Sequence, residues 1–462
     1  MTYRYRVALI FLLGFFIDCI NIFMSAITLP AIAESLQVSS LSVTWVANSY
    51  ILGLTLIIPL SRWLADRFGI RELMTFSMLL FAVTAVLAGG ADSFSSLITW
   101  RFLQGVAGGL LIPVGQSLTF QYFQGHERSK ISTIIMMIAL IAPALSPMLG
   151  GLIVDVAGWR PVFYVNAPFA LLTALLAWCW IKEPKTATCP APDLKGLLLV
   201  SIVLASLLIA LSLYGEYHNI SGALALAVLM LLSARLYYRH YQRDPQAIID
   251  LSLLKNTRLW LSVAVYYAVP GVFTGVNILA IFYLTTVLNL TTGVTGAFML
   301  LYAAGALVSM LVSGALYNKA GAGRLFFISL LLHSGGIALF ALTDVNTPLW
   351  FIGLIYLLTG TGGGIAANCA QTTALYDFRD AQLTKASVIW NINRQIVFSI
   401  GAALLMTLYQ TLNIIIPENA FKMTFLCAAV AGVIPLIFLC RVRYRTSLKP
   451  ADSATETSHE PS

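Results

Sequence analysis

Three charged residues lie inside apolar stretches that are long enough to cross a membrane. Asp18 is the one carboxylate well inside such a stretch, and Arg101 and Arg394 are the two cations fully inside others. A charge in the hydrocarbon core costs roughly 2.5–3.5 kcal/mol even on the lenient insertion scale, so charges in such places usually line a polar path and serve function. One titratable acid with two fixed cations therefore indicates a coupled transporter.

The composition is typical of an integral membrane protein. Of 462 residues, 59% are hydrophobic and 10% are charged, whereas soluble domains carry about 25% charged residues. Apolar runs of about 20 residues, the length of a membrane-spanning helix, recur along the chain. These runs are continuous rather than alternating, which predicts helices and not a transmembrane β-barrel. We therefore expect an all-α fold in a lipid bilayer.

The sequence lacks the patterns of several other function classes. It holds no Gly-x-x-x-x-Gly-Lys-Ser/Thr loop, so ATP is not expected as the energy source. No nucleophile–base or metal-ligand constellation stands out, so we expect no enzyme activity, no cofactor and no metal. The six cysteines predict neither a disulfide framework nor a metal site. The net charge of +8 needs no nucleic-acid partner, because its distribution along the chain explains it.

Apolar runs between polar breaks predict fourteen membrane-spanning helices. The weakest two are the middle pair, which a twelve-helix protein could carry as a re-entrant or interfacial element. The predicted ranges are 7–30, 42–61, 73–91, 96–120, 131–154 and 161–181, then 196–215 and 221–238, and finally 259–288, 295–317, 325–343, 349–375, 386–413 and 421–440.

Basic residues fall almost entirely on one side of this topology. An even number of helices places both termini on the same side, and of the 27 Lys and Arg residues all but four fall there. The exceptions are Arg160 and Lys422 on the opposite side, and Arg101 and Arg394 inside helices. Cytoplasmic loops carry an excess of Lys and Arg, so both termini are predicted to be cytoplasmic.

These elements predict four parts of the chain. Residues 1–185 form an N-terminal six-helix bundle, and residues 257–445 form a C-terminal one. Residues 186–256 form a linker that carries the two additional helices. Residues 446–462 are rich in Ser, Thr, Glu and Pro and predict a disordered cytoplasmic tail.

A short polar pattern occurs after both the second and the tenth predicted helix. Each copy has an aspartate or asparagine, then a basic residue, and then a glycine two positions after the basic residue. Repeated six-helix halves that flank a central site are a common transporter plan. The residues are Asp66, Arg67, Gly69 and Arg71 in the first loop, and Asn318, Lys319 and Gly321 in the second.

In these loops the sequence resembles the major facilitator superfamily, and specifically its fourteen-helix drug:proton antiporter branch, over roughly residues 7–440. The resemblance implies a fold of two six-helix bundles plus two extra central helices. It also implies that the protein is located in the bacterial inner membrane. It also implies that the repeated loop latches the cytoplasmic side of the two halves. Asp66 would bond Arg67 or a neighbouring helix N-terminus there, while Arg62 stands where the family usually has glycine.

Two further stretches carry the resemblance. Residues 101–109 are similar to the family's Arg-x-x-x-Gly motif, in which Arg101 would act as a fixed charge beside a carboxylate. The alternative is an arginine that snorkels to the outer surface. Residues 142–151 look like the motif that marks exporters, and the alternative is an ordinary kinked packing helix. Its residues are Pro143, Ser146, Pro147, Gly150 and Gly151, with Ser146 in place of the glycine before proline.

The first helix departs from the branch. Counting nine residues back from Pro30 gives Asn21, where the branch has an aspartate, and Asp18 lies three residues earlier. Positions i and i+3 share a helix face, so the acid has moved about one turn towards the cytoplasm. The resemblance implies that Asp18 and Arg101 couple to protons. The alternative is an acid that is satisfied by hydrogen bonds and never titrates.

Other polar residues inside helices are predicted to line the substrate cavity, because an amide facing lipid would be costly. The stretch around Asn391 and Arg394 looks like the polar helix of the branch, and its alternative is a purely structural interface. The predicted cavity residues are Asn21, Gln104, Asn277, Asn368, Gln371, Asn391 and Arg394.

Together these features predict a proton-coupled secondary transporter that exports small amphipathic molecules by alternating access. A count of one buried acid to two bases leaves open an exporter of an endogenous anionic metabolite, such as a siderophore or organic acid. A membrane sensor that does not transport is a weaker alternative, since no soluble signalling domain is attached. The expected partners are a small-molecule substrate, protons and the bilayer, with the protein as a monomer.

Overall fold

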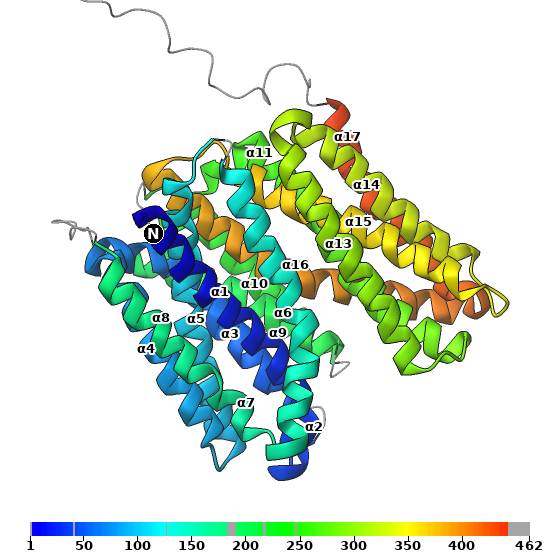
Figure 1. Cartoon of the computed structure of the whole chain (residues 1–462), viewed down its shortest axis with the longest axis horizontal. Helices are drawn as coiled ribbons and strands as arrows, with labels where there is room; N and C mark the ends of the chain where they lie inside the picture. Colours follow the sequence, from blue (N-terminus) through cyan, green and yellow to red (C-terminus); the bar gives the residue numbers. More distant parts are fainter. Residues whose placement is uncertain are drawn as a thin grey trace, which may run out of the picture.

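The computed structural model describes residues 2–39, 42–125, 127–182, 191–215, 219–244 and 247–441. Within these ranges the chain is helical and contains no strand. The elements form two bundles with a helical hairpin between them in the sequence (Figure 1). The predicted tail 446–462 and part of the predicted linker lie outside the described residues.

The N-terminal bundle contains the first six spanning segments. The sixth, predicted as one helix over 161–181, is divided at Val165 into a short and a longer helix. A short helix, α2 (Leu29–Ser35), follows the first segment. The spanning helices are α1 (Tyr3–Ile27), α3 (Trp45–Phe68), α4 (Ile70–Gly89), α5 (Phe94–Tyr122), α6 (Glu127–Ala157), and α7 (Arg160–Tyr164) with α8 (Asn166–Trp180).

The C-terminal bundle contains the last six. Its first segment, predicted as one helix over 259–288, is interrupted by a π-helical turn at Tyr267–Gly271 and ends in a second one at Tyr283–Val287. The first turn contains Pro270, which cannot donate to the helical ladder. The helices are α11 (Thr257–Tyr266), α12 (Val272–Phe282), α13 (Thr292–Ala320), α14 (Ala322–Leu339), α15 (Leu349–Ala374), α16 (Asp380–Ile415) and α17 (Ala420–Arg441).

The middle pair predicted from the sequence is a helical hairpin of α9 (Leu194–Gly215) and α10 (Ile220–Tyr241). Both helices are long and apolar enough to span a membrane. Helix α9 packs against α3 of the N-terminal bundle and α16 of the C-terminal bundle, while much of α10 is exposed. The re-entrant or interfacial alternative does not fit helices of this length.

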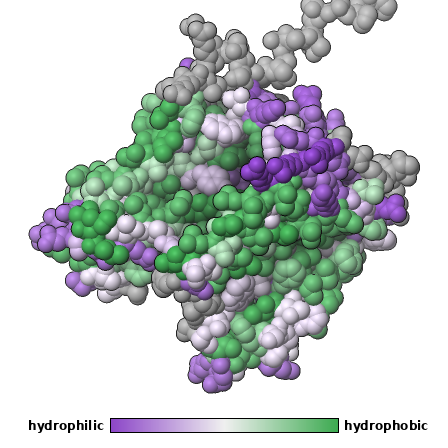
Figure 2. All heavy atoms as spheres, turned by 180° about the vertical axis from the view of Figure 1, so that it is seen from behind, coloured by the Kyte–Doolittle hydropathy of each residue, from purple (hydrophilic) through white to green (hydrophobic). Residues whose placement is uncertain are grey.

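The predicted helix count is confirmed. Thirteen segments in the described part of the chain meet the length and hydropathy of a membrane span. Helix α6 is the fourteenth: it runs 31 residues and carries no charged residue between Lys130 and Asp155. The face seen in Figure 2 is largely hydrophobic, with hydrophilic residues gathered towards the ends of the molecule, as expected for a protein surrounded by lipid.

The two bundles meet at the end that carries the N terminus and diverge towards the other end (Figure 1). At the closed end, Ser117 on α5 lies 2.7 Å from Thr384 on α16, oxygen to oxygen. Ser129 on α6 donates to the carbonyl of Gly314 on α13 at 2.7 Å. The structure is therefore closed on the side of the N terminus.

Candidate functional site

Asp18 lies buried where α1, α3 and α5 meet. Only 2% of its surface is exposed, and the hydroxyl of Tyr50 on α3 donates to its Oδ1. Gly108 on α5 leaves the space for this pair, because a Cβ there would lie 2.6 Å from Asp18 Oδ1 and 2.9 Å from the Tyr50 hydroxyl. The carboxylate predicted from the sequence therefore accepts a hydrogen bond from Tyr50 and lies next to Gly108, which leaves room for both side chains.

Arg101 is enclosed within the N-terminal bundle. Its Nε donates to the carbonyl of Val46 at 3.0 Å and its Nη2 to Ser25 Oγ at 2.9 Å. Its Nη1 donates to Asn21 Oδ1 at 3.1 Å and to Gln104 Oε1 at 2.8 Å. The residue is 0% exposed, so the alternative that it snorkels to the surface is wrong.

Asp18 and Arg101 are connected through Tyr50. The guanidinium carbon of Arg101 lies 4.4 Å from the centroid of the Tyr50 ring, and the hydroxyl of that ring bonds Asp18. Within the described residues no direct ion pair joins Asp18 to an arginine. Asn21, at the position of the branch's aspartate, takes the bond to Arg101 that an acid would take there. The displaced acid therefore reaches the arginine indirectly.

Arg394 enters this region from the other half of the molecule. It lies on α16, is 7% exposed, and its guanidinium carbon stands 4.7 Å from the ring centroid of Phe15 on α1. Its charge is close enough to attract Asp18 electrostatically. In the described part of the chain Arg394 has no hydrogen-bond partner and no ion-pair contact, whereas Arg101 makes four hydrogen bonds.

The amides predicted to line the cavity are placed differently from one another. Asn368 donates to the carbonyl of Met310 and to Ser313 Oγ, both at 3.1 Å, and accepts from Thr133 of α6 at 3.2 Å. Asn391 donates to Gln116 Oε1 on α5 at 2.5 Å. Both therefore join the two halves.

The other two amides stay within the C-terminal bundle. Gln371 accepts from the indole of Trp390 at 2.6 Å. Asn277 lies on α12, and its buried Oδ1 has no partner among the described residues. The structure thus brings Asp18, Asn21, Arg101 and Gln104 together, with Arg394 facing them, and places Asn277, Asn368, Gln371 and Asn391 elsewhere.

Arg128, which sequence reasoning did not single out as a site residue, joins the two halves at the closed end. It is the second residue of α6, is 3% exposed, and its Nη1 donates to the carbonyls of Leu375 and Tyr376 at 2.6 and 3.0 Å. Its Nη2 donates to the carbonyl of Phe120 at 3.2 Å. Leu375 and Tyr376 directly follow the last residue of α15, so an arginine of one half is bonded to the main chain at the C-terminal end of a helix in the other.

The repeated loops have the same backbone geometry. Gly69 has φ 92° and ψ 150°, and Gly321 has φ 78° and ψ 150°. Each ends one helix and precedes the next, in a region of φ that only glycine adopts readily. The structure thus shows the internal repeat in its backbone.

Side chains near the first loop pair differently from the expectation. Asp66 does not pair with Arg67. It lies 3.6 Å from Arg62, one turn earlier on α3, while Arg71 pairs with Glu72 at 2.9 Å. Arg62, in place of the family's usual glycine, has thus become the partner of Asp66. Lys319 in the second loop is exposed.

The stretch that resembles the exporter motif lies on α6, which continues as one helix through it. Ser146 Oγ donates to the carbonyl of Ala142 at 2.6 Å. A Cβ on Gly150 would contact Ile27 and Met24 of α1 at 3.4–3.6 Å, while nothing lies within 4 Å of one on Gly151. Pro143 is partly buried in the same helix. The side chain of Pro147 lies outside the described residues.

A cavity of about 340 Å³, which we call the hairpin cavity, opens where α9 packs between the two bundles. Its walls come from α3, α9, α12 and α16. On α16 it begins at Ser399, five residues beyond Arg394, or about 7.5 Å along the helix. It therefore adjoins the buried charges on the side away from the closed end.

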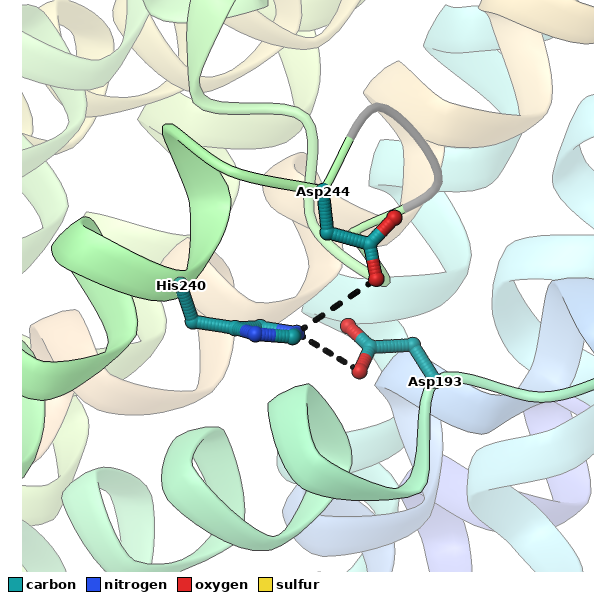
Figure 3. A group of neighbouring side chains, drawn as sticks. All are labelled: Asp193, His240 and Asp244. Carbon is teal, nitrogen blue, oxygen red and sulfur yellow. Dashed lines mark hydrogen bonds and ion pairs between the residues drawn. The ribbon is translucent and has the colours of Figure 1, made fainter.

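One group of side chains in the described part of the chain is close enough to hold a metal ion: Asp193, His240 and Asp244 (Figure 3). His240 Nε2 lies 2.7 Å from Asp193 Oδ1 and 3.8 Å from Asp244 Oδ2. Asp193 also accepts the backbone N–H groups of Gly196 and Ile248 at 2.7 and 3.1 Å. These bonds fasten the start of α9 to the end of α10.

Two six-helix bundles that enclose buried charges, joined by a membrane hairpin, define the class of polytopic membrane transporters. The sequence model of the Major Facilitator Superfamily matches residues 11–402. The chain belongs to the major facilitator superfamily.

Its curated relatives include proteins named for drug resistance. A putative multidrug resistance protein MdtD of Pectobacterium atrosepticum is 26% identical over 445 residues, which cover 93% of this chain and 94% of the relative. A multidrug resistance protein B homolog of Mycobacterium tuberculosis is 28% identical over 378 residues, covering 79% and 69%. The family has transporters and not enzymes as members, in agreement with the sequence analysis.

Solved structures share the fold. The human organic anion transporter MFSD10 (TETRAN) superposes with a TM-score of 0.65 at 14% identity, over 95% of this chain and 100% of the other. The proton:xylose symporter XylE superposes with a TM-score of 0.63 at 14% identity, over 95% and 96%. At 14% identity, these superpositions show that the fold is shared.

Proposed function

We propose that this transporter exchanges protons for small amphipathic molecules, which it exports from the cytoplasm by alternating access. The observation that carries the proposal is Asp18, a buried carboxylate with one hydrogen-bond donor among the described residues, facing a cation of the opposite half. The names of the relatives support a drug-resistance role. The distribution of Lys and Arg supports cytoplasmic termini, so the structure would be closed to the cytoplasm and open outwards.

In this mechanism Asp18 carries the proton. A proton that enters from the open side neutralises the carboxylate, and the hydroxyl of Tyr50 remains as its neighbour. Neutralisation weakens the attraction between Asp18 on α1 and Arg394 on α16, because a coulombic interaction needs both charges. The halves can then rock and open the cavity to the cytoplasm, where loss of the proton and entry of substrate complete the exchange.

One structural observation favours a second candidate, the transport of an anion. Arg394 is a buried cation with no hydrogen bond and no ion-pair contact in the described part of the chain, and a substrate carboxylate could pair with it. An ionised Asp18 would compete with such a substrate for Arg394. Proton and anion would then bind together rather than in exchange, so the direction of the coupled proton flux separates the two candidates.

The test uses everted membrane vesicles loaded with a pH-sensitive dye and given an inside-acid gradient. We expect lipophilic test solutes to release protons from vesicles with the wild-type protein and not from those with Asp18→Asn. Asp155→Asn is the matched control, since Asp155 is an exposed carboxylate at the end of α6. Proton release that survives in Asp18→Asn would refute the role of Asp18. If protons and a carboxylate solute cross the membrane in the same direction, the second candidate is favoured.

A further inference from the structure

The hairpin cavity has the chemistry of a binding site for an uncharged molecule. None of the described residues that line it is charged. Apolar side chains, among them Ile51 and Leu208, form much of its surface, and its polar groups are neutral, among them the side chains of Asn48, Ser212 and Gln410. A buried charge would lose its hydration here without gaining a counterion, so the lining selects against charged ligands.

Helix α9 supplies one complete wall of this cavity. Leu208, Ile209, Leu211, Ser212 and Tyr214 all line it. Asn48 Nδ2 of α3 donates to Ser212 Oγ at 3.3 Å, which fixes this wall to the N-terminal bundle. Helix α16 of the C-terminal bundle also lines the cavity. Movement of one bundle against the other therefore changes the cavity directly.

We propose that the hairpin cavity binds the transported molecule and that α9 is part of the substrate site. The ligand class is an uncharged compound with an apolar body and one or two hydrogen-bonding groups, a combination that ligand pockets of this kind recognise. This inference rests on the proposed function and narrows its substrate class. It gives the inserted hairpin a role in binding, since a twelve-helix core would leave this wall open.

The experiment measures equilibrium binding to purified protein in lipid nanodiscs. The probes are N-phenyl-1-naphthylamine, which is uncharged, and 8-anilino-1-naphthalenesulfonate, which has the same aromatic skeleton with a sulfonate. Leu208→Trp fills the cavity, and Leu198→Trp is the matched control on the same helix, where the side chain is 62% exposed. Empty nanodiscs correct for partition into lipid.

We expect the dissociation constant of the uncharged probe to rise at least tenfold in Leu208→Trp and to stay unchanged in Leu198→Trp. The sulfonate should bind the wild type at least tenfold more weakly. Ala402→Leu, which intrudes from α16, replaces Leu208→Trp if that variant elutes as aggregate. Neutral-probe binding that neither intrusion weakens, or sulfonate binding of equal strength and equal sensitivity, would overturn the proposal.

This result is independent of proton coupling, because binding is measured without a gradient. If Leu208→Trp abolishes binding while the vesicles show no proton release, the cavity is a binding site and the antiport proposal fails. If the vesicles show Asp18-dependent exchange while the intrusions leave binding and exchange intact, antiport stands and the hairpin cavity is not the site.

Discussion

At the scale of single residues, the site depends on how two buried charges are matched to their surroundings. Arg101 has four hydrogen bonds within its own bundle, so it serves as a fixed part of the structure. Among the described residues Asp18 has one donor, Tyr50, and the space around this pair exists because residue 108 is glycine. This difference leaves Asp18 able to change its charge state with little rearrangement.

Gly108→Ala tests this dependence. The added methyl would lie within 3 Å of both Asp18 and Tyr50, so we expect it to push the pair apart and lower proton-coupled transport at least tenfold. Overpacking of this kind costs about 1–3 kcal/mol of stability. Gly335→Ala on α14 is the control, because nothing lies within 4 Å of its added Cβ. The check is dye-reported transport with thermal unfolding; equal transport in both variants would contradict the assigned role.

The sequence predicted the charges of this site but not their connection. Asp18 and Arg101 stand out because charge is rare in apolar helices, and both are buried as expected. Tyr50 carries no such signal, since tyrosine is an ordinary residue in a membrane helix. Its role depends on the approach of α3 to α5, where a Cβ on Gly105 would lie 2.0 Å from the Tyr50 carbonyl. That distance is a property of packing and not of residue type.

At the scale of helices, the closed end is held by contacts between α6 and the end of α15. Arg128 bonds carbonyl groups of the main chain there. Main-chain carbonyls are present at every residue, so no sequence pattern marks the partner of this arginine. The π turns in the segment 257–287 were not predicted for a related reason. An apolar stretch has the same composition whether or not the helix contains a turn with an extra residue.

Arg128→Gln should loosen the closed end. A neutral amide keeps at most part of the bonds to Leu375, Tyr376 and Phe120, so we expect the outward-open arrangement to lose population. The measurement is the alkylation rate of a cysteine introduced at Thr384, which lies against Ser117 at the closed end. We expect a rise of at least fivefold in Arg128→Gln. Arg324→Gln, an exposed arginine on the same side, is the control, and equal rates in both would refute the contact's role.

At the scale of the whole molecule, the architecture follows from patterns that the sequence displays openly. Length of apolar runs, the positions of Lys and Arg, and the repeated loop were enough to predict fourteen helices in two halves with a hairpin between them. The place of that hairpin was not predictable, because an apolar helix facing lipid and one facing protein have similar compositions. Only the structure places α9 between α3 and α16.

The connection from the hairpin to the C-terminal bundle gives a pH-dependent contribution to stability. Burial alone would raise the pKa of Asp250, but hydrogen bonds from Ser252 and Lys385 and the charge of Lys385 bring it below its ordinary value of 3.8. A carboxyl with a lowered pKa stabilises the fold above its unfolded value and loses that contribution as the pH falls through the folded value. Its size should be about 1 kcal/mol or less.

Asp250→Asn tests this contribution. We expect the variant to unfold at a lower temperature than the wild type at pH 6, and the difference to disappear as the pH falls below 3.8, the ordinary value of the carboxyl. Thermal unfolding in detergent from pH 6 to pH 3 provides the check. Asp155→Asn should differ little from the wild type throughout, and a constant Asp250→Asn difference across the series would show that the ion pair with Lys385 is not its cause.

The position of Arg394 also affects how tightly the flow of protons is coupled to the flow of substrate. Its charge and that of Asp18 belong to separate halves, so reorientation of an empty, unprotonated carrier must pull opposite charges apart. A protonated carrier meets no such resistance. We therefore expect Arg394 to limit slippage, the futile turnover that would let a proton gradient dissipate without moving any cargo.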